Sequence, residues 1–552
     1  MANLSLDALS FRQIREGNFI YADKTGYIHD ILKDSPSRCC FLSRPRRFGK
    51  TLLLGTIQEL FQGDRELFRG LKIDQSGYKF ERHPVLKFDM SYAAIYSKDD
   101  LIDNIKDDFT RFAKDFEVTL DTKVFGKMLQ HLLIGICTKH GAPAVILVDE
   151  YDAPLTDNIM DRELAMGIRK VLHDFYRTLK TNINFIRLAF VTGITRFAMT
   201  ALDSGPNNFV DISLSPDFAG ICGFTDIEMD EIFNDRYAQT LDVLKHKGRI
   251  AQDDDIAKMK EKIIKYYDGY NWLGEKRVLN PFSLLNFFAH NKFDTYWPLS
   301  GQPSHLSALV RKNPLDYFLP KLDGHASKET RMAELRRLKP VPVLFHSGYL
   351  TIDKTIIKDV IIDNEPVSEE YFTFKIPNTE VAKGFEISLF LDAFDPDDDF
   401  FSDFTERLPA ALLKRDSAEM SSLIHDLLSA ISFEQHEPTE KHYHAVLQAA
   451  FIVAGLEVLG QTSSSLGKSD MAVFLQKMIR VVIEVKYCKA GNKDTTDNDQ
   501  SDKILSAALD TAVEQIRSKD YAAPFRAAGK KVVGVAIAVR GRDDVAVRFV
   551  EP

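Results

Sequence analysis

The sequence predicts an α/β protein of several domains, and the first domain is expected to be a parallel sheet covered by helices. At 552 residues the chain is too long for a single hydrophobic core. Short apolar segments alternate with helical stretches as far as about residue 220, the rhythm of a parallel sheet with helices on both faces. The segment Gly49-Lys50-Thr51 follows one such strand, and the apolar run Ala144–Val148 ends in Asp149 and Glu150.

Four segments of this region have the composition of buried strands. They are Cys39–Leu42, Pro84–Asp89, Ala144–Val148 and Ile186–Gly193. After Thr51, apolar residues recur at helical spacing, so the glycine motif is predicted to lie at a junction between strand and helix. In a parallel sheet a ligand binds at the carboxyl ends of the strands, which is where this junction lies.

The junction has the chemistry of a nucleotide phosphate site. Main-chain N–H groups and the positive end of the helix dipole point at bound phosphate, Lys50 can reach the β- and γ-phosphates, and the Thr51 hydroxyl can hold Mg²⁺. Asp149 can bind the same ion through water, and Glu150 can orient the attacking water. We therefore expect ATP or GTP with Mg²⁺ here. A basic surface turn that caps a core helix would also explain the glycine motif alone, but the second motif favours the nucleotide site.

Neighbouring residues extend this site. Arg44 occupies the first glycine position of the pattern G-x-x-x-x-G-K-[ST], so its side chain must point away from the loop. Thr192 can sense the γ-phosphate by a hydrogen bond or, equally, cap a turn at a strand end. Arg196 can stabilise charge that develops in the transition state. The predicted nucleotide-binding residues are Arg46, Arg47, Phe48, Gly49, Lys50, Thr51, Asp149 and Thr192.

Composition limits the classes of protein that remain. Apolar residues make up 45% of the chain and charged residues 27%, as in an ordinary soluble globular protein. The five cysteines are scattered and form no C-x-x-C pair, which argues for a reducing compartment and against a disulfide framework. Because no signal-peptide pattern and no run of roughly 18 apolar residues is found, a cytoplasmic protein without membrane contact is expected. The net charge of −9 excludes a basic nucleic-acid coat protein.

The middle of the chain is predicted to be a lid. From about residue 225 to 355 the pattern is mostly helical, and Phe345–Ile352 and Tyr371–Ile376 read as two strands that follow the helices. Helices followed by a β-ribbon suit a lid or winged-helix module. The acidic run Asp395–Asp399 is expected to be a loop or hinge, with a solvated linker favoured over a cation site. The polar stretch Gly491–Lys503 is expected to be a mobile loop.

A second chemical centre is predicted near the C-terminus. The segments around Met471–Phe474 and Arg480–Lys486 read as adjacent strands. If they form a hairpin that turns near Lys477, Asp470 lies opposite Glu484, because paired residues of an antiparallel ladder have a constant index sum. Lys486, two residues after Glu484, projects from the same face. Paired carboxylates can hold Mg²⁺ or Mn²⁺ and activate water. The alternative is an exposed hairpin face with ordinary surface charges.

Two helices are expected beside this hairpin. The first begins near Glu440, which could supply a third carboxylate. His442 and His444 are poor candidates for zinc ligands, because residues two apart diverge on a helix. The second helix, Ala507–Ile516, carries Glu514 and Gln515.

With these residues in view, the chain resembles the predicted AAA-ATPase-like family that carries a C-terminal PD-(D/E)XK-type nuclease domain. The resemblance covers nearly the whole length. In that family the replaced first glycine is usual, so Arg44 does not argue against a nucleotide site. The motifs that carry the resemblance are Phe19–Thr25, Arg44–Thr51, Val148–Pro154, Thr192–Phe197, Cys222–Thr225, Tyr267–Tyr270, Ser347–Thr351 and Ile376–Val381.

The resemblance implies a fold and a division of the chain. It implies a P-loop NTPase sheet of AAA or STAND type in residues 1–224, a helical, winged-helix-like lid in 225–390, a connector in 391–430, and a restriction-endonuclease-like α/β domain in 431–552. It also implies a nuclease triad of Asp470, Glu484 and Lys486, with Gln515 as an accessory. The family tends to have Gly-Arg-x-Asp where this chain has Gly467-Lys468-Ser469-Asp470, and lysine meets phosphate only as a point charge.

The leading functional prediction is an ATPase that controls a metal-dependent nuclease. ATP, Mg²⁺ and, at the nuclease site, Mn²⁺ are the expected cofactors, and DNA is favoured over RNA as substrate. The resemblance points to bacterial defence or mobile-element biology, and a homo-oligomer is compatible with it. A STAND-like signalling switch, whose C-terminal domain binds but does not cleave, is the alternative. A DNA-binding ATPase with an inactive nuclease fold is a third, which intact Asp470, Glu484 and Lys486 disfavour.

Overall fold

The computed structural model describes residues 2–7, 9–35, 37–92, 95–195, 209–273, 277–300, 306, 309, 340–362, 365–385, 398–430, 439–460, 470–476, 479–489, 498–541 and 544–552. Arg196, Lys477 and the segment 467–469 therefore lie outside the described residues. The described residues up to Leu306 and those from Pro340 to Ala382 form one compact unit. Leu309 and the described residues from Lys383 onward form a second unit. The four-part division expected from the sequence stays a prediction.

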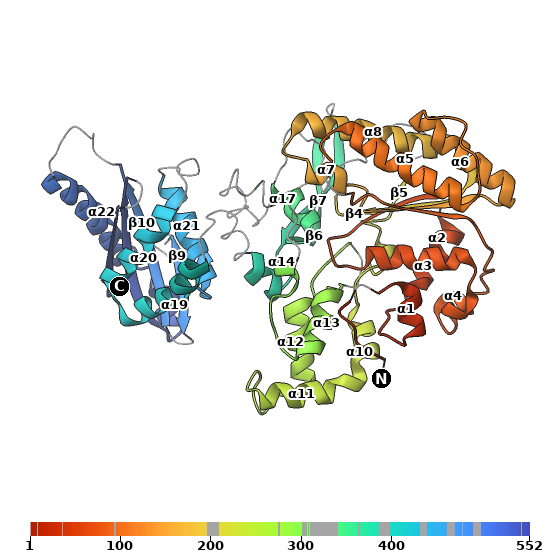
Figure 1. Ribbon diagram of the computed structural model, residues 1–552. Coiled ribbons are helices and arrows are strands. Elements are labelled where there is room, and N and C mark those ends of the chain that lie inside the picture. The colour runs from red at the N-terminus through yellow and green to blue at the C-terminus, as the bar shows by residue number, and fades with distance from the viewer. Residues whose placement is uncertain are drawn as a thin grey trace. The chain divides into compact units, whose positions relative to one another are not determined.

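The N-terminal part of the first unit is built on a five-stranded sheet in which every described strand pair is parallel (Figure 1). The order is β2-β3-β4-β1-β5, so the nucleotide motifs of β1 and β3 flank β4. The four expected strands are confirmed, and a short fifth strand follows them. The strands are β1 (Cys39–Ser43), β2 (Val85–Asp89), β3 (Ala144–Asp149), β4 (Ile186–Gly193) and β5 (Val210–Asp211).

Helices cover both faces of this sheet, as the alternating pattern predicted. In Figure 1, α5, α6 and α8 lie on one side and α1 to α4 on the other. Helix α3 packs against β2, β3 and β4 through Leu53, Leu54 and Ile57, which are all buried. The helices are α1 (Phe11–Glu16), α2 (Thr25–Asp34), α3 (Lys50–Gln62), α4 (Lys72–Gln75), α5 (Lys98–Asp115), α6 (Phe125–His140), α7 (Ala153–Asp157) and α8 (Arg162–Thr181), with 3-10 turns at Arg65–Phe68 and Ile183–Phe185.

The same unit continues into a helical region with its own aromatic core. Phe233 and Phe288 stack in this core with their ring centroids 4.2 Å apart. Thr225 and Glu228 form a capping box at the start of α10, and Asn280 caps α13. The helices are α10 (Asp226–Phe233), α11 (Tyr237–His246), α12 (Ile256–Tyr267), α13 (Pro281–His290), α14 (Trp297–Ser300) and α17 (Pro340–Ser347), with 3-10 turns at Pro216–Phe218 and Asn234–Arg236.

A two-stranded antiparallel ribbon, β6 (Thr351–Ile362) and β7 (Glu365–Lys375), follows these helices. The expected strand Phe345–Ile352 was therefore wrong in its first half, because the chain up to Ser347 ends α17. Gly348, at φ +87°, then turns the chain before β6 begins. A short buried apolar run has the same appearance in a helix and in a strand, which explains the error. The expected strand Tyr371–Ile376 forms the end of β7.

The second unit is a mixed five-stranded sheet with the order β12-β11-β10-β9-β8. Strands β10 and β11 are parallel, and the other pairs are antiparallel. Helix α22 packs on β10 and β11, α21 on β8 and β10, and α20 on β12. The elements are α19 (Asp398–Lys414), α20 (Ser417–Ala430), α21 (Glu440–Val453), β8 (Glu457–Gly460), β9 (Met471–Gln476), β10 (Ile479–Cys488), α22 (Asn498–Ser518), α23 (Ala523–Ala527), β11 (Lys531–Arg540) and β12 (Asp544–Val550).

Parts of two expected loops of this unit are helical, and the rest of both, residues 395–397 and 491–497, lies outside the described residues. Asp398 and Asp399, from the acidic run, belong to α19, where acidic residues near a helix N-terminus are favourable. Residues 498–503, from the polar stretch, belong to α22. Polarity alone misled the prediction, because an exposed helix end is as polar as a loop. All five cysteines are free thiols, and the described helices include none long and apolar enough to cross a membrane.

Candidate nucleotide and metal sites

The glycine motif forms the turn between β1 and α3. Gly49 caps α3 with φ +95°, a left-handed conformation in which a side chain would be strained. Lys50 begins the helix, and its side chain is only 3% exposed. The ammonium of Lys50 donates to the carbonyl oxygens of Arg44 (3.1 Å) and Pro45 (3.3 Å) and lies 3.4 Å from a Glu150 carboxylate oxygen. The Lys50 side chain therefore bends back over the loop. Its ammonium lies beside Glu150, the residue expected to orient water.

Asp149 is buried at the end of β3 and is fixed by its neighbours. Its Oδ1 accepts hydrogen bonds from the Thr192 hydroxyl (2.8 Å) and from the Glu150 main-chain N–H (3.2 Å). Glu150 adopts φ +48°, and its side chain is 27% exposed. The Thr192 side chain is fully buried, so the hydroxyl that contacts Asp149 is not exposed to solvent. In this geometry Thr192 orients the carboxylate, and its expected contact with the γ-phosphate stays a prediction.

Asp152 is a structural carboxylate that the sequence reasoning did not single out. Its two oxygens accept hydrogen bonds from the main-chain N–H groups of Ile194 (3.1 Å) and Thr195 (2.6 Å) and from the Thr195 hydroxyl (2.5 Å). Burial, followed by the charge of Glu150, raises the pKa of Asp152 to about 6. Asp152 thereby ties the turn after β3 to the segment after β4. Its place in the motif Val148–Pro154, directly after the strand, was the available signal.

Arg44 leaves the interior of the loop, as expected. Its guanidinium is buried and donates to the carbonyl oxygens of Ser43 and Ser213, both at 2.8 Å. The guanidinium carbon also lies 4.5 Å from the centroid of the Trp272 ring. Burial lowers the pKa of Arg44 to about 10. Arg44 therefore connects the loop to neighbouring segments.

The helical region contacts the next residues of the loop. The indole N–H of Trp297 donates to the carbonyl oxygen of Arg46 at 2.9 Å. Phe48 packs edge-on against Tyr270, with centroids 4.7 Å apart. A Cβ on Gly348 would lie 2.8 Å from Cβ of Pro45, so only glycine fits there. Both tryptophans of the chain, Trp272 and Trp297, thus pack on this loop.

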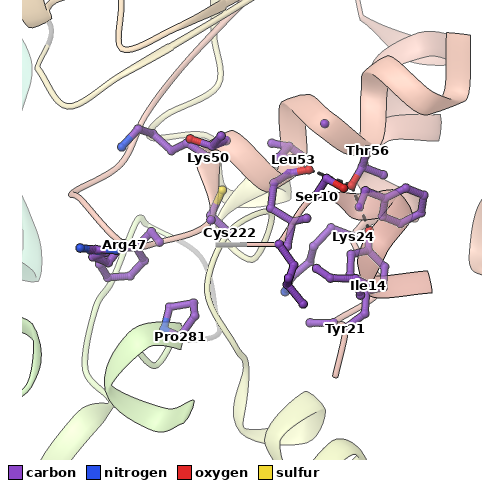
Figure 2. A pocket seen from close by; sticks show the side chains of 18 of the residues that line it. Ser10, Ile14, Tyr21, Lys24, Arg47, Lys50, Leu53, Thr56, Cys222 and Pro281 are labelled. Atoms are coloured by element: carbon purple, nitrogen blue, oxygen red, sulfur yellow. Dashed lines mark hydrogen bonds between the residues drawn. The ribbon is translucent and has the colours of Figure 1, made fainter. Parts of the chain in front are cut away.

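A cavity of about 860 Å³ opens beside the loop (Figure 2). Lys50 and Arg47 lie toward one end of it, and Ile14 and Tyr21 lie toward the other. Gly49, Thr51 and Glu150 complete the polar end, and Lys87 of β2, which the sequence reasoning missed, also lines the cavity. The remaining wall is largely apolar and includes Phe11, Leu53, Phe224, Pro281, Phe282 and Leu285.

A buried ion pair closes one side of this cavity. The Lys24 ammonium contacts both carboxylate oxygens of Glu228, at 2.7 and 2.6 Å. Burial lowers the pKa of Lys24, and the opposing effect of Glu228 does not fully offset it. The pair joins the N-terminal segment to α10, 204 residues away. The cavity therefore has one end with charged side chains, among them Arg47, Lys50 and Glu150, and a largely apolar remainder.

The C-terminal hairpin has the expected register. Met471 pairs with Ile483 and Ala472 with Val482, which continues to Asp470 opposite Glu484. The main-chain N–H of Val485 donates to Oδ2 of Asp470 at 2.8 Å. The predicted hairpin is therefore confirmed, and the two carboxylates lie at the same end of it.

Lys486 lies between two carboxylates. Its ammonium is 3.1 Å from Oε1 of Glu484 and 3.3 Å from Oε1 of Glu440, the residue expected as a third carboxylate. Burial, followed by the charge of Asp470, raises the pKa of Glu484 to about 7. Burial lowers the pKa of Lys486, but Glu484 and Glu440 raise it more, so the pKa lies above its ordinary value. The sequence reasoning therefore placed the charged residues of this site together.

The donor atoms of this site fit a hard divalent cation. Oε2 of Glu484 is buried and accepts no hydrogen bond from the described residues. Oε1 of Gln515, on the helix α22 that packs on β10, is also buried and accepts none from them, and its place at this site stays a prediction. Buried oxygens without partners are costly and suit an oxygen-binding ion such as Mg²⁺. Within the described ranges, however, no three His, Cys, Asp or Glu side chains are gathered closely enough to hold a metal. The carboxylate pair is thus a partial ligand set.

Comparisons with known proteins agree with this geometry. Residues 7–203 match the family described as predicted AAA-ATPase, and residues 438–549 match the PD-(D/E)XK nuclease superfamily. The first match contains the loop, β3 and β4, and the second contains the hairpin and its flanking helices. The chain therefore combines a predicted AAA-ATPase domain with a PD-(D/E)XK nuclease superfamily domain, and the predicted fold class is confirmed.

One relative resembles the chain along nearly its whole length. It is a protein of Azotobacter chroococcum mcd 1 named "Uncharacterized protein in vnfD 5'region". The two sequences are 28% identical over 537 residues, which cover 96% of this chain and 95% of the relative. The similarity thus runs through both matched regions of this chain and covers nearly the whole of the relative.

Proposed function

We propose that this protein is an ATPase whose nucleotide state controls a metal-dependent nuclease acting on nucleic acid, with DNA favoured over RNA. The two domain matches support ATPase and nuclease chemistry. The observation that carries the nucleotide half is the cavity that joins Lys50, Thr51 and Glu150 to an apolar wall. A P-loop lysine over the loop and a carboxylate within 3.4 Å of it are the groups that nucleotide hydrolysis requires.

The residues predicted for the nucleotide site, in and around this cavity, each have a proposed role. Lys50 binds the β- and γ-phosphates, and Thr51 and Asp149 hold Mg²⁺, which neutralises phosphate charge when bound. Glu150 orients the attacking water, and Thr192 holds Asp149 in place. Arg46 and Arg47 add positive charge, and Phe48 and Gly49 shape the loop. Arg196, outside the described residues, is proposed to stabilise the transition state. The purine and ribose occupy the apolar end.

The nuclease half rests on the hairpin. Asp470 and Glu484 are proposed to hold Mg²⁺ or Mn²⁺, which activates water and offsets phosphate charge when bound. Lys486 orients the nucleophile, and Gln515 assists from α22. Oε2 of Glu484 is buried and accepts no hydrogen bond from the part of the chain that the structure describes, which supports this assignment. The four-part domain division, a cytoplasmic location, a homo-oligomer and a role in defence or mobile-element biology belong to the same proposal.

A nucleotide-gated switch is the second candidate. The observation in its favour is the contact of both tryptophans and Tyr270 with the loop, because a change in the loop would reach the helical region directly. In that function the C-terminal domain binds a partner without cleaving it. The partial ligand set at the hairpin is also compatible with it.

The decisive test measures binding and turnover separately. We expect Lys50→Ala to weaken ATP binding, because the phosphate contact is lost. Glu150→Gln should still bind ATP but hydrolyse it slowly, because the Mg²⁺ ligand Asp149 remains. Equilibrium binding of a fluorescent ATP analogue and steady-state phosphate release would be measured on the full chain, with Glu81→Gln, an exposed residue away from the cavity, as control. Unchanged turnover in both variants would overturn the nucleotide assignment.

A further inference from the structure

Asp470 receives support from a residue outside the hairpin. Its main-chain carbonyl oxygen lies 2.7 Å from Nε2 of His444, which is part of α21. A carbonyl oxygen can only accept a hydrogen bond, so Nε2 of His444 must carry the proton in this contact. His444 is partly buried, and its Nε2 meets the main-chain oxygen of Asp470, not the carboxylate. His444 therefore contacts the main chain of the residue whose carboxylate is the proposed metal ligand.

The position of Asp470 explains why this contact matters. The paired ladder of β9 begins at Met471, one residue later, so Asp470 is not held by the regular strand pairing. Val485 fixes one carboxylate oxygen from the side of β10. His444 fixes the peptide group that joins Asp470 to Met471 from the side of α21. Together the two hydrogen bonds restrain the side chain and the main chain of the same residue.

Helix α21 is anchored independently of this contact. The Thr439 hydroxyl accepts from the His442 main-chain N–H and caps the helix. The Tyr443 hydroxyl donates to the carbonyl oxygen of Gly541 at 2.6 Å, and Val446 and Leu447 are buried in the core. The helix thus has anchors of its own, and the loss of one hydrogen bond at the partly buried His444 should not unfold it.

One face of α21 contacts both charged parts of the proposed site. Glu440 and His444 are four residues apart, which places them one above the other on a helix. Glu440 contacts the Lys486 ammonium, and His444 contacts the main chain at Asp470. The hairpin supplies Asp470 and Glu484, the carboxylates of the site. The face of α21 contacts the main chain of Asp470 and the ammonium of Lys486.

We propose that His444 is a positioning residue for the metal site, holding Asp470 so that its carboxylate and that of Glu484 can bind one divalent cation. This rests on the proposed nuclease function. His444 itself is not a ligand in this arrangement, because its Nε2–H is directed at the carbonyl oxygen. Loss of a residue that orients a metal ligand typically weakens metal binding by about 10- to 100-fold. We expect the loss of the His444 hydrogen bond to weaken metal binding by an amount in that range.

The test measures Mn²⁺ binding to the full-length protein by isothermal titration calorimetry. His444→Leu removes the donor but keeps most of the side-chain volume, and His444→Gln restores an N–H near the position of Nε2. We expect the Kd for Mn²⁺ to rise at least about 10-fold in His444→Leu and to stay within about 3-fold of wild type in His444→Gln. His425→Leu, an exposed histidine of α20 in the same unit, is the matched control and should bind as wild type does. Thermal unfolding is recorded for every variant.

The outcomes separate this inference from the proposed function. Wild-type protein that binds no Mn²⁺ at the hairpin, judged by Glu484→Ala as reference, would overturn the nuclease function and the role of His444 with it. If wild-type protein binds Mn²⁺ and folded His444→Leu binds it with the same Kd, the positioning role alone is overturned. If His444→Leu and His444→Gln lose Mn²⁺ affinity equally and both have a lowered Tm, His444 has a purely structural role. That result would also overturn the positioning role.

Discussion

Glu380 offers a quantitative test of how the helical region supports the nucleotide loop. Its side chain is fully buried, and Oε1 accepts hydrogen bonds from the main-chain N–H groups of Tyr296 (2.8 Å) and Trp297 (3.0 Å). The indole of Trp297 in turn contacts the carbonyl oxygen of Arg46. Oε2 of Glu380 is buried as well. The perturbation is Glu380→Gln, which keeps an oxygen acceptor and removes the charge.

The size of the effect follows from the pKa. Burial raises the pKa of Glu380 to about 7 from the ordinary value of 4.5. A difference of this size corresponds to about 3 kcal/mol between the two protonation states. Because the folded pKa is raised, the stabilisation is complete below the unfolded pKa near 4.5 and is lost as the pH rises through 7. Wild-type protein should therefore lose about 2 to 3 kcal/mol from this group between pH 5 and pH 8, and Glu380→Gln should not.

The assay is urea unfolding followed by tryptophan fluorescence at pH 5, 6, 7 and 8. The chain has only two tryptophans, Trp272 and Trp297, and both lie in the first unit, so the signal reports that unit. Glu81→Gln, at an exposed carboxylate, serves as control and should follow wild type at every pH. A free-energy difference between Glu380→Gln and wild type that stays constant across this range would refute the reasoning.

Three further predictions concern the two sites. Asp470→Ala, Glu484→Ala and Lys486→Ala should each abolish phosphodiester cleavage and leave ATP hydrolysis largely intact, which a gel assay with Mg²⁺ or Mn²⁺ and a phosphate-release assay check together. Nucleic-acid affinity or cleavage should differ between the ATP-bound and ADP-bound protein, and identical values with ATP, ADP and no nucleotide would indicate two independent modules. Gly348→Ala should destabilise the first unit by about 1 to 3 kcal/mol, because its φ is positive and its Cβ would meet Pro45; unfolding midpoints equal to wild type would contradict this.

The sequence was sufficient where the pattern is local. The loop, β3 and the carboxylates after it are encoded by short apolar runs next to glycine and charged residues. The hairpin could also be predicted in register, because the constant index sum needs only the position of the turn. Asp470 opposite Glu484 follows from that sum, and the observed pairs continue to it. Lys486 then had to share their face, because side chains alternate along a strand.

The sequence was insufficient where the contact is distant. Asp152 accepts hydrogen bonds from Ile194 and Thr195, which are 42 and 43 positions away. Glu380 accepts them from Trp297 and Tyr296, which are 83 and 84 positions away. Nothing near Glu380 in the sequence shows that its carboxylate is buried or that Trp297 lies next to it. His444 was considered only as a metal ligand, since its contact at Asp470 requires knowledge of how α21 packs on the hairpin. Periodicity describes one element at a time and cannot supply such pairs.

Arg44 shows how this loop differs from one that begins with glycine. A glycine at that position would leave the loop to be shaped by its own backbone, whereas Arg44 reaches out to Ser213 and Trp272. The next residues are also contacted from outside, Pro45 by Gly348 and Arg46 by Trp297. The conformation of the loop therefore depends on segments that lie well over a hundred residues further along the chain. A nucleotide can shift a conformational equilibrium only through different affinities for its states, and these contacts provide the place where such a difference can arise. In this chain, the proposed coupling between ATP and the helical region would begin at the loop itself.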